Sequence, residues 1–216
     1  MKILRVDPNH PEVEAIEKAA KAILDGELVI FPTETVYGLA ADALNELAVR
    51  KVFEAKGRDT SSPLPVQIAN VSELERVVLE VPDAAIILAK EFWPGPLTLV
   101  LYKNRAVSPI LTAGTEKIGV RIPDHPVALA LVKTVGRPIV ATSANLSGQS
   151  PATTAEQAIA SLGGSVAVVL DAGECRLRVP STVVDVTVTP PQILRVGAIR
   201  VDAIESVVGP CTLCER

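Results

Sequence analysis

Apolar and polar positions follow two different periods along this chain, and each period predicts a different kind of element. In residues 11–25 the apolar positions fall three or four apart, which predicts an amphipathic helix with Pro11 at its first position and Gly26 after its end. Residues 28–31 form a short continuous apolar run, which predicts a buried strand. Further helices are predicted over residues 46–55, 82–93 and 126–135. Further strands are predicted over residues 36–41, 63–69, 97–102, 118–122, 138–141, 166–170, 182–186 and 193–196.

Two hydroxyl residues are each followed three positions later by a glutamate, which is a signature of a helix start. Ser72 with Glu75, and Thr153 with Glu156, therefore predict two capping boxes. The chain after Arg200 is expected to form a short helix and a tail.

The order of the predicted elements indicates the fold class. Helices and strands interleave, but several strands follow one another with no helix between them. This order favours an α+β (mixed α/β) fold in which helices pack on a twisted mixed sheet, and it argues against a purely doubly wound sheet. One domain is expected over residues 1–200, with a C-terminal helix and tail over residues 201–216.

Composition supports a globular domain and narrows the classes of ligand. Hydrophobic residues make up 48% of the chain and charged residues 21%, so a sizeable core can form. Aromatic residues make up only 3%, which argues against a surface that binds by aromatic stacking. The net charge of −4 argues against non-specific binding of nucleic acid, but a few local cations can still bind a phosphorylated small molecule.

The chain has no apolar stretch near the ~20 residues that a membrane span needs, and its N-terminus turns quickly to charged residues. Three cysteines fit a reducing cytoplasm better than a disulfide framework, so no membrane contact and a cytoplasmic location are expected. Cys211 and Cys214 have the spacing of half a zinc site, but without a second pair they are interpreted as an inert, frayed tail. His10 and His125 are the only histidines, which excludes a multi-histidine metal site.

Two polar segments carry groups that suit an anion. Residues 56–58 (Lys-Gly-Arg) follow a helix and offer a point charge, a close backbone approach and a planar fork of donors. Residues 141–148 (ATSANLSG) end a strand with hydroxyls, a side-chain amide and Gly. Each segment also has a plainer interpretation, as cations at a helix end and as an ordinary polar loop. Neither a GxxxxGK[ST] nor a GxGxxG motif is present.

Three other segments place polar groups beside apolar strands. Residues 32–39 (PTETVYGL), and residues 180–185 with 194–197, hold hydroxyl and cationic side chains that either contact a ligand or cap their own turns. Arg121 lies within an apolar strand and needs a partner, because an unpaired buried charge is costly. It therefore either meets a ligand carboxylate or faces solvent on the other side of the sheet.

Seven motifs occur in an order and spacing that give the chain a family resemblance. They are FPTETVYGLAAD, FEAKGR followed by PLPVQI, FWPGPLTLVL, GVRIPDHP, ATSANLSG, PSTVVD and ILRVGAI. Together they resemble the YrdC-like family, whose members include L-threonylcarbamoyladenylate synthases, from about residue 12 to about residue 200. The resemblance implies a twisted mixed sheet flanked by helices around a concave, basic cavity. It also implies the short form of the synthase, without an additional C-terminal domain.

The activity implied by the resemblance is that of a nucleotidyltransferase. ATP, L-threonine and bicarbonate would give L-threonylcarbamoyladenylate and pyrophosphate, with Mg²⁺ accompanying the ATP. Partner proteins would then use the adenylate to modify adenosine 37 of tRNAs that read codons beginning with A, and a direct contact with tRNA or double-stranded RNA stays open. The alternative is an RNA-binding or ribosome-maturation factor of the same fold without catalysis, which would show a steep salt dependence.

The resemblance assigns roles motif by motif. Lys56 and Arg58 would be the catalytic residues, acting on the ATP phosphates. Further ATP contacts are implied for Thr60, Lys117, Asn145, Thr153 and Arg195. L-Threonine contacts are implied for Thr33, Arg121, Ser143 and Ser181, with Arg121 on the threonine carboxylate. No metal ligand is implied. Two positions depart from the family pattern: Asp59 replaces a usual Pro, and the His that some members carry near Pro65 is absent.

Overall fold

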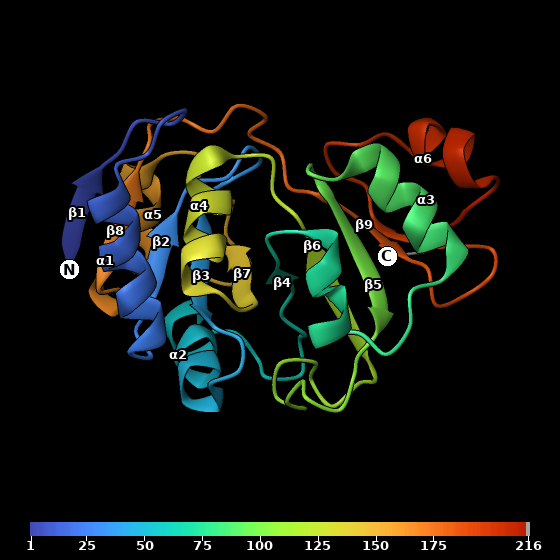
Figure 1. Ribbon diagram of the computed structural model, residues 1–216, viewed down its shortest axis with the longest axis horizontal. Helices are drawn as coiled ribbons and strands as arrows, with labels where there is room; N and C mark the ends of the chain where they lie inside the picture. Colours follow the sequence, from blue (N-terminus) through green and yellow to red (C-terminus); the bar gives the residue numbers. More distant parts are fainter. Residues whose placement is uncertain (215–216) are drawn as a thin grey trace.

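The computed structural model describes residues 1–214 as an eleven-stranded mixed β-sheet flanked by helices (Figure 1). The strand order across the sheet is β1-β8-β2-β3-β7-β4-β6-β5-β9-β10-β11. The strands are β1 (Lys2–Arg5), β2 (Val29–Phe31), β3 (Gly38–Asp42), β4 (Val66–Gln67), β5 (Leu97–Tyr102), β6 (Lys117–Arg121), β7 (Ile139–Ser143), β8 (Val168–Asp171), β9 (Thr182–Asp185), β10 (Gln192–Arg195) and β11 (Thr212–Leu213). The helices are α1 (Val13–Leu24), α2 (Glu46–Lys56), α3 (Asp83–Phe92), α4 (Pro126–Val135), α5 (Ala155–Leu162) and α6 (Val201–Val208), with 3₁₀ helices η1 (Val71–Arg76) and η2 (Gly163–Ser165). The predicted fold class is confirmed.

Two hydrophobic cores lie on opposite faces of the sheet, because successive side chains of a strand point to opposite sides. In β2, Val29 and Phe31 belong to the core under α1 and α4, whereas Ile30 belongs to the core under α2, α3, α5 and α6. Helices α1 and α4 pack against each other beside β2, β3 and β7 (Figure 1). They cover only one part of their face, and the rest of that face carries the cavity described below.

Two neighbouring strands pack closely at one glycine. A Cβ atom built on Gly38 of β3 would lie 2.6 Å from the ring of Phe31 on the paired strand β2. Only glycine therefore fits at the point where the polar turn of residues 32–37 returns to the sheet.

Most predicted elements are found within a few residues of their expected bounds. Helix α4 begins and ends at the predicted residues, and α2 extends one residue further, to Lys56. Gly57 then ends α2 in the left-handed conformation, with φ of 55°. The first helix begins at Val13, so Pro11 lies before it and is not its first residue.

Both predicted capping boxes are misplaced. Near Ser72 the cap residue is Asn70, whose side-chain amide donates to the Glu73 carboxylate. The element that follows it is the 3₁₀ helix η1. The second cap residue is Thr154, which accepts the backbone N–H of Gln157. In each case neighbouring polar residues fit the same pattern, and the geometry of the chain entering the helix decides between them.

The pattern of apolar residues missed the two edge strands. β1 is largely exposed and, among the described strands, pairs with β8 alone, so it lacks the apolar pattern of a buried strand. β11 has two exposed residues and pairs with β10. The segment around it is held by a bond from Cys211 N–H to the Glu205 carboxylate and one from Cys214 N–H to the Ile193 carbonyl. The prediction of a frayed tail is therefore wrong as far as Cys214.

Candidate functional site

A concave cavity of about 300 Å³ opens on the sheet face that α1 and α4 leave uncovered. Its volume is at the lower end of the range for small-molecule sites. It is lined by residues from the 32–38 turn, the segment after α2, and strands β4, β5, β6, β7, β9 and β10. The lining residues are Thr33, Thr35, Val36, Tyr37, Gly38, Arg58, Pro63, Leu64, Pro65, Val66, Gln67, Thr98, Val100, Gly119, Arg121, Ala141, Thr142, Ser143, Pro151, Pro180, Ser181, Val183, Leu194 and Arg195.

The cavity floor is formed by every second side chain of the strands. In β5, Leu97, Leu99 and Leu101 are buried in the core, whereas Thr98 and Val100 face the cavity. The same alternation in β6 directs Gly119 and Arg121 into the cavity. Polar side chains can thus lie within apolar strands because the cavity face of the sheet receives them.

Three arginines from distant parts of the chain converge on this cavity: Arg58, Arg121 and Arg195. Among the described residues, no Asp or Glu lines it. Burial lowers the pKa of Arg195, and the nearby charges of Arg121 and Arg58 lower it further. The protein is acidic overall, with a net charge of −4, yet it concentrates positive charge where a ligand would enter. This arrangement attracts anions.

Arg121 is held by groups on two other segments. Its Nη2 atom lies 2.5 Å from a carboxylate oxygen of Glu34, its Nη1 donates to Thr35 Oγ1 at 3.0 Å, and its Nε donates to the Gly95 carbonyl at 3.0 Å. Both charged side chains of the pair are at least 92% buried. Within residues 1–214 neither Glu34 oxygen accepts a well-oriented hydrogen bond, so charge attraction to Arg121 is their main compensation.

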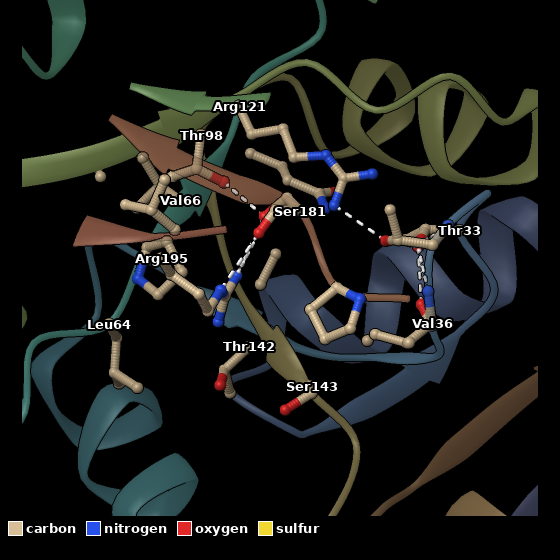
Figure 2. A pocket seen from close by; sticks show the side chains of 18 of the residues that line it. Thr33, Val36, Leu64, Val66, Thr98, Arg121, Thr142, Ser143, Ser181 and Arg195 are labelled. Carbon is tan, nitrogen blue, oxygen red and sulfur yellow. Dashed lines mark hydrogen bonds between the residues drawn. The ribbon is translucent and has the colours of Figure 1, made fainter. Parts of the chain in front are cut away.

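A second polar cluster joins Thr98, Ser181 and Arg195, as Figure 2 shows. The hydroxyl oxygens of Thr98 and Ser181 lie 2.8 Å apart. Arg195 donates from Nη2 to Ser181 Oγ at 3.1 Å, and from Nε and Nη2 to the Ser181 carbonyl at 3.1 and 2.9 Å. The guanidinium is therefore fixed at the cavity wall by the residue that precedes β9.

Lys56 lies behind the cavity wall and is 2% exposed. Its ammonium donates to the carbonyl oxygens of Ser143 and Asn145, the latter at 2.6 Å, and its own carbonyl accepts the N–H of Ser147 at 2.9 Å. The residue thus connects the end of α2 to the polar loop that follows β7. Its implied contact with phosphates stays a prediction, because Lys56 does not line the cavity.

The structure brings together six of the eleven residues to which a ligand contact was assigned. Those that line the cavity are Thr33, Arg58, Arg121, Ser143, Ser181 and Arg195. Those that do not are Lys56, Thr60, Lys117, Asn145 and Thr153. The implied contacts of all eleven stay predictions.

Four of the five residues outside the lining have structural partners: Lys56, described above, and Lys117, Asn145 and Thr153. Lys117 forms an ion pair with Asp185 at 2.8 Å. The amide of Asn145 donates to the carbonyls of Leu146 and Gln149, both at 2.8 Å. The hydroxyl of Thr153 lies 3.2 Å from Gln157 Oε1, at the start of α5.

Asp59, the charged departure from the family pattern, points into its own loop. Its carboxylate accepts the backbone N–H of Ser61 at 2.7 Å, and this bond lowers its pKa. Asp59 is fully exposed and is not among the lining residues. It therefore stabilises a turn beside Arg58, outside the cavity.

No role was assigned from the sequence to Glu34, Thr98 or Gln67. Glu34, which pairs with Arg121 behind the lining, was noted only as part of a polar turn, although the need of Arg121 for a partner was recognised. Thr98 is the one polar residue in the run Leu97 to Leu101, which is the available signal for a cavity-facing position. Gln67 also lines the cavity, and its buried Oε1 atom has no hydrogen-bond partner among the described residues.

The Lys56 ammonium provides a pH-dependent test of this geometry. Burial, together with the charge of Arg58, lowers the pKa of Lys56 to about 8, whereas an unfolded lysine titrates near 10.4. Between these values the unfolded chain binds a proton that the folded chain has released. The free energy of unfolding should therefore increase as the pH rises from about 8 to about 10, by on the order of 1–3 kcal/mol from this residue.

Urea unfolding at intervals from pH 7.5 to 10, on the unchanged protein and on Lys56→Met, isolates this contribution. The difference in unfolding free energy between the two proteins should change with pH in the stated direction. If the unfolding free energies of the two proteins changed with pH in parallel, Lys56 would have an ordinary pKa.

Comparisons with known proteins come from both sequence and structure. The Sua5/yciO/yrdC family, described as "telomere recombination", matches residues 21–197. The chain is 47% identical over 194 residues to a threonylcarbamoyl-AMP synthase of Pyrococcus abyssi, and 48% identical over 196 residues to one of Bacillus subtilis. Each similarity covers 90% of this chain but 57% of the relative, so the chain spans a little over half the length of these relatives.

A solved structure shows the same likeness in three dimensions. The crystal structure of P. abyssi Sua5 complexed with L-threonine matches with a TM-score of 0.97 at 44% identity, over 99% of this chain and 63% of that one. No helix within residues 1–214 is long and apolar enough to cross a membrane.

Proposed function

The chain belongs to the Sua5/yciO/yrdC family, and from this premise we propose that it forms L-threonylcarbamoyl-AMP and pyrophosphate from L-threonine, bicarbonate and ATP. The observation that carries the proposal is the convergence of Arg58, Arg121 and Arg195 on one cavity without a lining carboxylate among the described residues. All three substrates carry negative charge on the groups that react or are held, and such a cavity suits them.

The chemistry requires no nucleophile from the protein. The threonine amine adds to bicarbonate and water leaves, which gives a carbamate. A carbamate oxygen then attacks the α-phosphorus of ATP, and pyrophosphate leaves with the electrons of the broken P–O bond. The protein contributes positioning and neutralisation of charge, as in other phosphoryl and nucleotidyl transfers. A closed cavity also protects the carbamate from water.

The cavity arginines would divide these tasks. Arg121, fixed by Glu34, Thr35 and the Gly95 carbonyl, is placed to hold the threonine carboxylate. Arg58 and Arg195 would hold the phosphates, one from the segment after α2 and the other from β10. Thr33, Ser143 and Ser181 add hydroxyl groups along the wall between them.

Magnesium fits this site as part of the nucleotide. Mg²⁺ prefers oxygen ligands and often keeps several waters beside one or two carboxylates. The described lining offers hydroxyls and amides but no carboxylate, so the ion would be held by ATP phosphate oxygens and water. Lys117 and Thr60 lie outside the cavity and would contact the nucleotide only where it extends beyond the lining.

The product suits a following acyl transfer. A mixed anhydride of a carbamate and AMP is an activated group, and we propose that tRNA-modifying partners transfer it to tRNA in the cytoplasm. The alternative of a non-catalytic RNA-binding factor is less well supported, since a cavity of about 300 Å³ suits small molecules. Double-stranded RNA is bound by long surfaces that contact successive grooves.

Mass spectrometry of the reaction tests the proposal. The purified chain is incubated with Mg²⁺, ATP, L-threonine and ¹³C-bicarbonate, and omission of each substrate in turn serves as a control. We expect a threonylcarbamoyl-AMP ion that carries one ¹³C atom, together with an equal amount of pyrophosphate. An Arg58→Ala protein purified in the same way controls for contaminating synthase. A folded chain that forms no labelled adenylate would overturn the proposed activity of this chain.

A further inference from the structure

Two neighbouring hydroxyl groups on the cavity floor are not fully used by the protein. Thr98 Oγ1 and Ser181 Oγ lie 2.8 Å apart, and the residues are 4% and 6% exposed. Both line the cavity, and Figure 2 shows them facing one another across its floor. Apart from the bond that Ser181 Oγ accepts from Arg195, the two hydroxyls make no other hydrogen bond within residues 1–214.

Counting hydrogens shows what this pair can offer. Arg195 only donates, so it uses a lone pair of Ser181 and supplies no acceptor. Of the two hydroxyl hydrogens, one lies between Thr98 and Ser181 and the other has no partner within residues 1–214. The pair therefore presents one donor and at least one lone pair to the cavity. A ligand hydroxyl, which is itself both donor and acceptor, can use both at once.

An apolar floor lies directly beside the hydroxyl pair. A Cβ atom built on Gly119 would lie 3.2 Å from the Thr98 methyl carbon and 3.3 Å from Pro65 Cβ. A side chain at this position would therefore crowd the Thr98 methyl group and the Pro65 ring, and glycine keeps this part of the cavity floor low. The hydroxyl pair thus lies beside an apolar surface formed by Gly119, Pro65 and the Thr98 methyl group.

Thr98 also lies on the strand that is paired with the strand of Arg121. Val100 of β5 is paired with Gly119 of β6, and both line the cavity. Thr98 lies two positions before Val100, and Arg121 lies two positions after Gly119. Because the strands are antiparallel and side chains alternate, Thr98 and Arg121 point from the same face of the sheet. Thr98 and Arg121 therefore line the same part of the cavity floor, and an amino acid whose carboxylate is bound by Arg121 can place its side chain against Thr98.

We propose that Thr98 is a specificity-determining residue for the amino-acid substrate. With Ser181 it binds the β-hydroxyl of L-threonine, while the apolar surface formed by Gly119, Pro65 and the Thr98 methyl group contacts the γ-methyl group. This inference rests on the proposed function and extends it, because it names the groups that distinguish threonine from its close analogues.

Calorimetric titration with matched amino acids tests the inference. L-2-Aminobutyrate lacks only the β-hydroxyl of threonine, and L-serine lacks only its methyl group. Thr98→Val removes the hydroxyl at nearly constant shape and should weaken L-threonine binding ~10-fold, with L-2-aminobutyrate changed less than ~2-fold. Thr98→Ser retains the hydroxyl and should keep the preference for threonine over L-2-aminobutyrate within ~3-fold of that of the unchanged protein.

Gly119→Ala probes the other half of the inference. The added methyl group narrows the floor without changing any hydrogen-bonding group, so L-threonine should lose several-fold more affinity than L-serine. Circular dichroism and urea unfolding identify folded variants, and Thr98→Ser with Gly119→Ala keeps the inference testable if Thr98→Val does not fold.

The outcomes separate this inference from the proposed function. If Thr98→Val lost as much affinity for L-2-aminobutyrate as for L-threonine, the role of Thr98 would be overturned while the proposed activity would stand. A loss of ATP affinity with unchanged threonine affinity would overturn it too, because it would place a nucleotide hydroxyl at the pair. An unchanged protein that binds no L-threonine, and forms no adenylate, would overturn both.

Discussion

Replacement of Arg121 by alanine is expected to remove measurable L-threonine binding and to lower the free energy of unfolding by about 3–5 kcal/mol. The large stability effect follows from Glu34. Its carboxylate is 1% exposed and accepts no well-oriented hydrogen bond within residues 1–214, so loss of Arg121 leaves a buried charge without compensation. The bonds to Thr35 and to the Gly95 carbonyl are lost at the same time.

A double variant separates the two effects. Glu34→Gln removes the buried charge, so Glu34→Gln with Arg121→Ala should regain more than half of the lost stability but none of the threonine affinity. Arg176→Ala is a matched control, because Arg176 forms an exposed ion pair with Asp124 at 2.7 Å. Its loss should cost less than about 1 kcal/mol.

Urea unfolding and threonine calorimetry on these four proteins give the two readouts. ATP affinity should fall much less than threonine affinity in Arg121→Ala. Threonine binding within about 3-fold of normal would show that another group holds the carboxylate. A double variant as unstable as the single one would show that Glu34 is not the source of the penalty.

The strand segments could be predicted from the sequence because their apolar side chains repeat locally. In β5 the residues Leu97, Leu99 and Leu101 already indicate a core face, and Thr98 already interrupts the apolar run. The local pattern does not predict which element, if any, covers the other face of the strand. Whether Thr98 faces solvent, a helix or a cavity depends on α1 and α4, which cover only part of that face.

For the cations of the site, the sequence likewise predicted the need for a partner but not which distant residue supplies it. The expectation that Arg121 needs a partner follows from its apolar neighbours, but that partner, Glu34, lies on a turn far away in the sequence. Lys56 resembled a solvent-facing cation at a helix end, whereas its ammonium is buried against carbonyls 87 and 89 residues further along the chain. Such pairings depend on the order of the strands in the sheet, and the spacing of apolar residues does not predict that order.

Replacement of Lys56 by alanine is expected to reduce pyrophosphate release about 100-fold or more, the size of effect that a misplacement of ~1 Å can have in an active site. The physical reason lies in the loop after β7. Two buried carbonyl acceptors, of Ser143 and Asn145, lose their shared donor, and the loop is no longer held to the end of α2. Ser143 lines the cavity, so its displacement would misalign the cavity wall beside the residues proposed to hold the phosphates.

Lys51→Ala provides the matched control, since Lys51 belongs to the same helix but forms a partly exposed ion pair with Glu27 at 2.9 Å. Its pyrophosphate release should stay within about 2-fold of normal, and its stability within about 1 kcal/mol. Lys56→Met, which keeps the apolar stem and removes only the donors, should behave like Lys56→Ala in catalysis while losing less stability. Because the ammonium supports the loop after β7, we also expect Lys56→Met to expose the 143–147 backbone amides to faster hydrogen exchange. A folded Lys56→Met protein with normal threonine- and bicarbonate-dependent turnover would show that neither the charge nor the anchored loop is needed for the reaction.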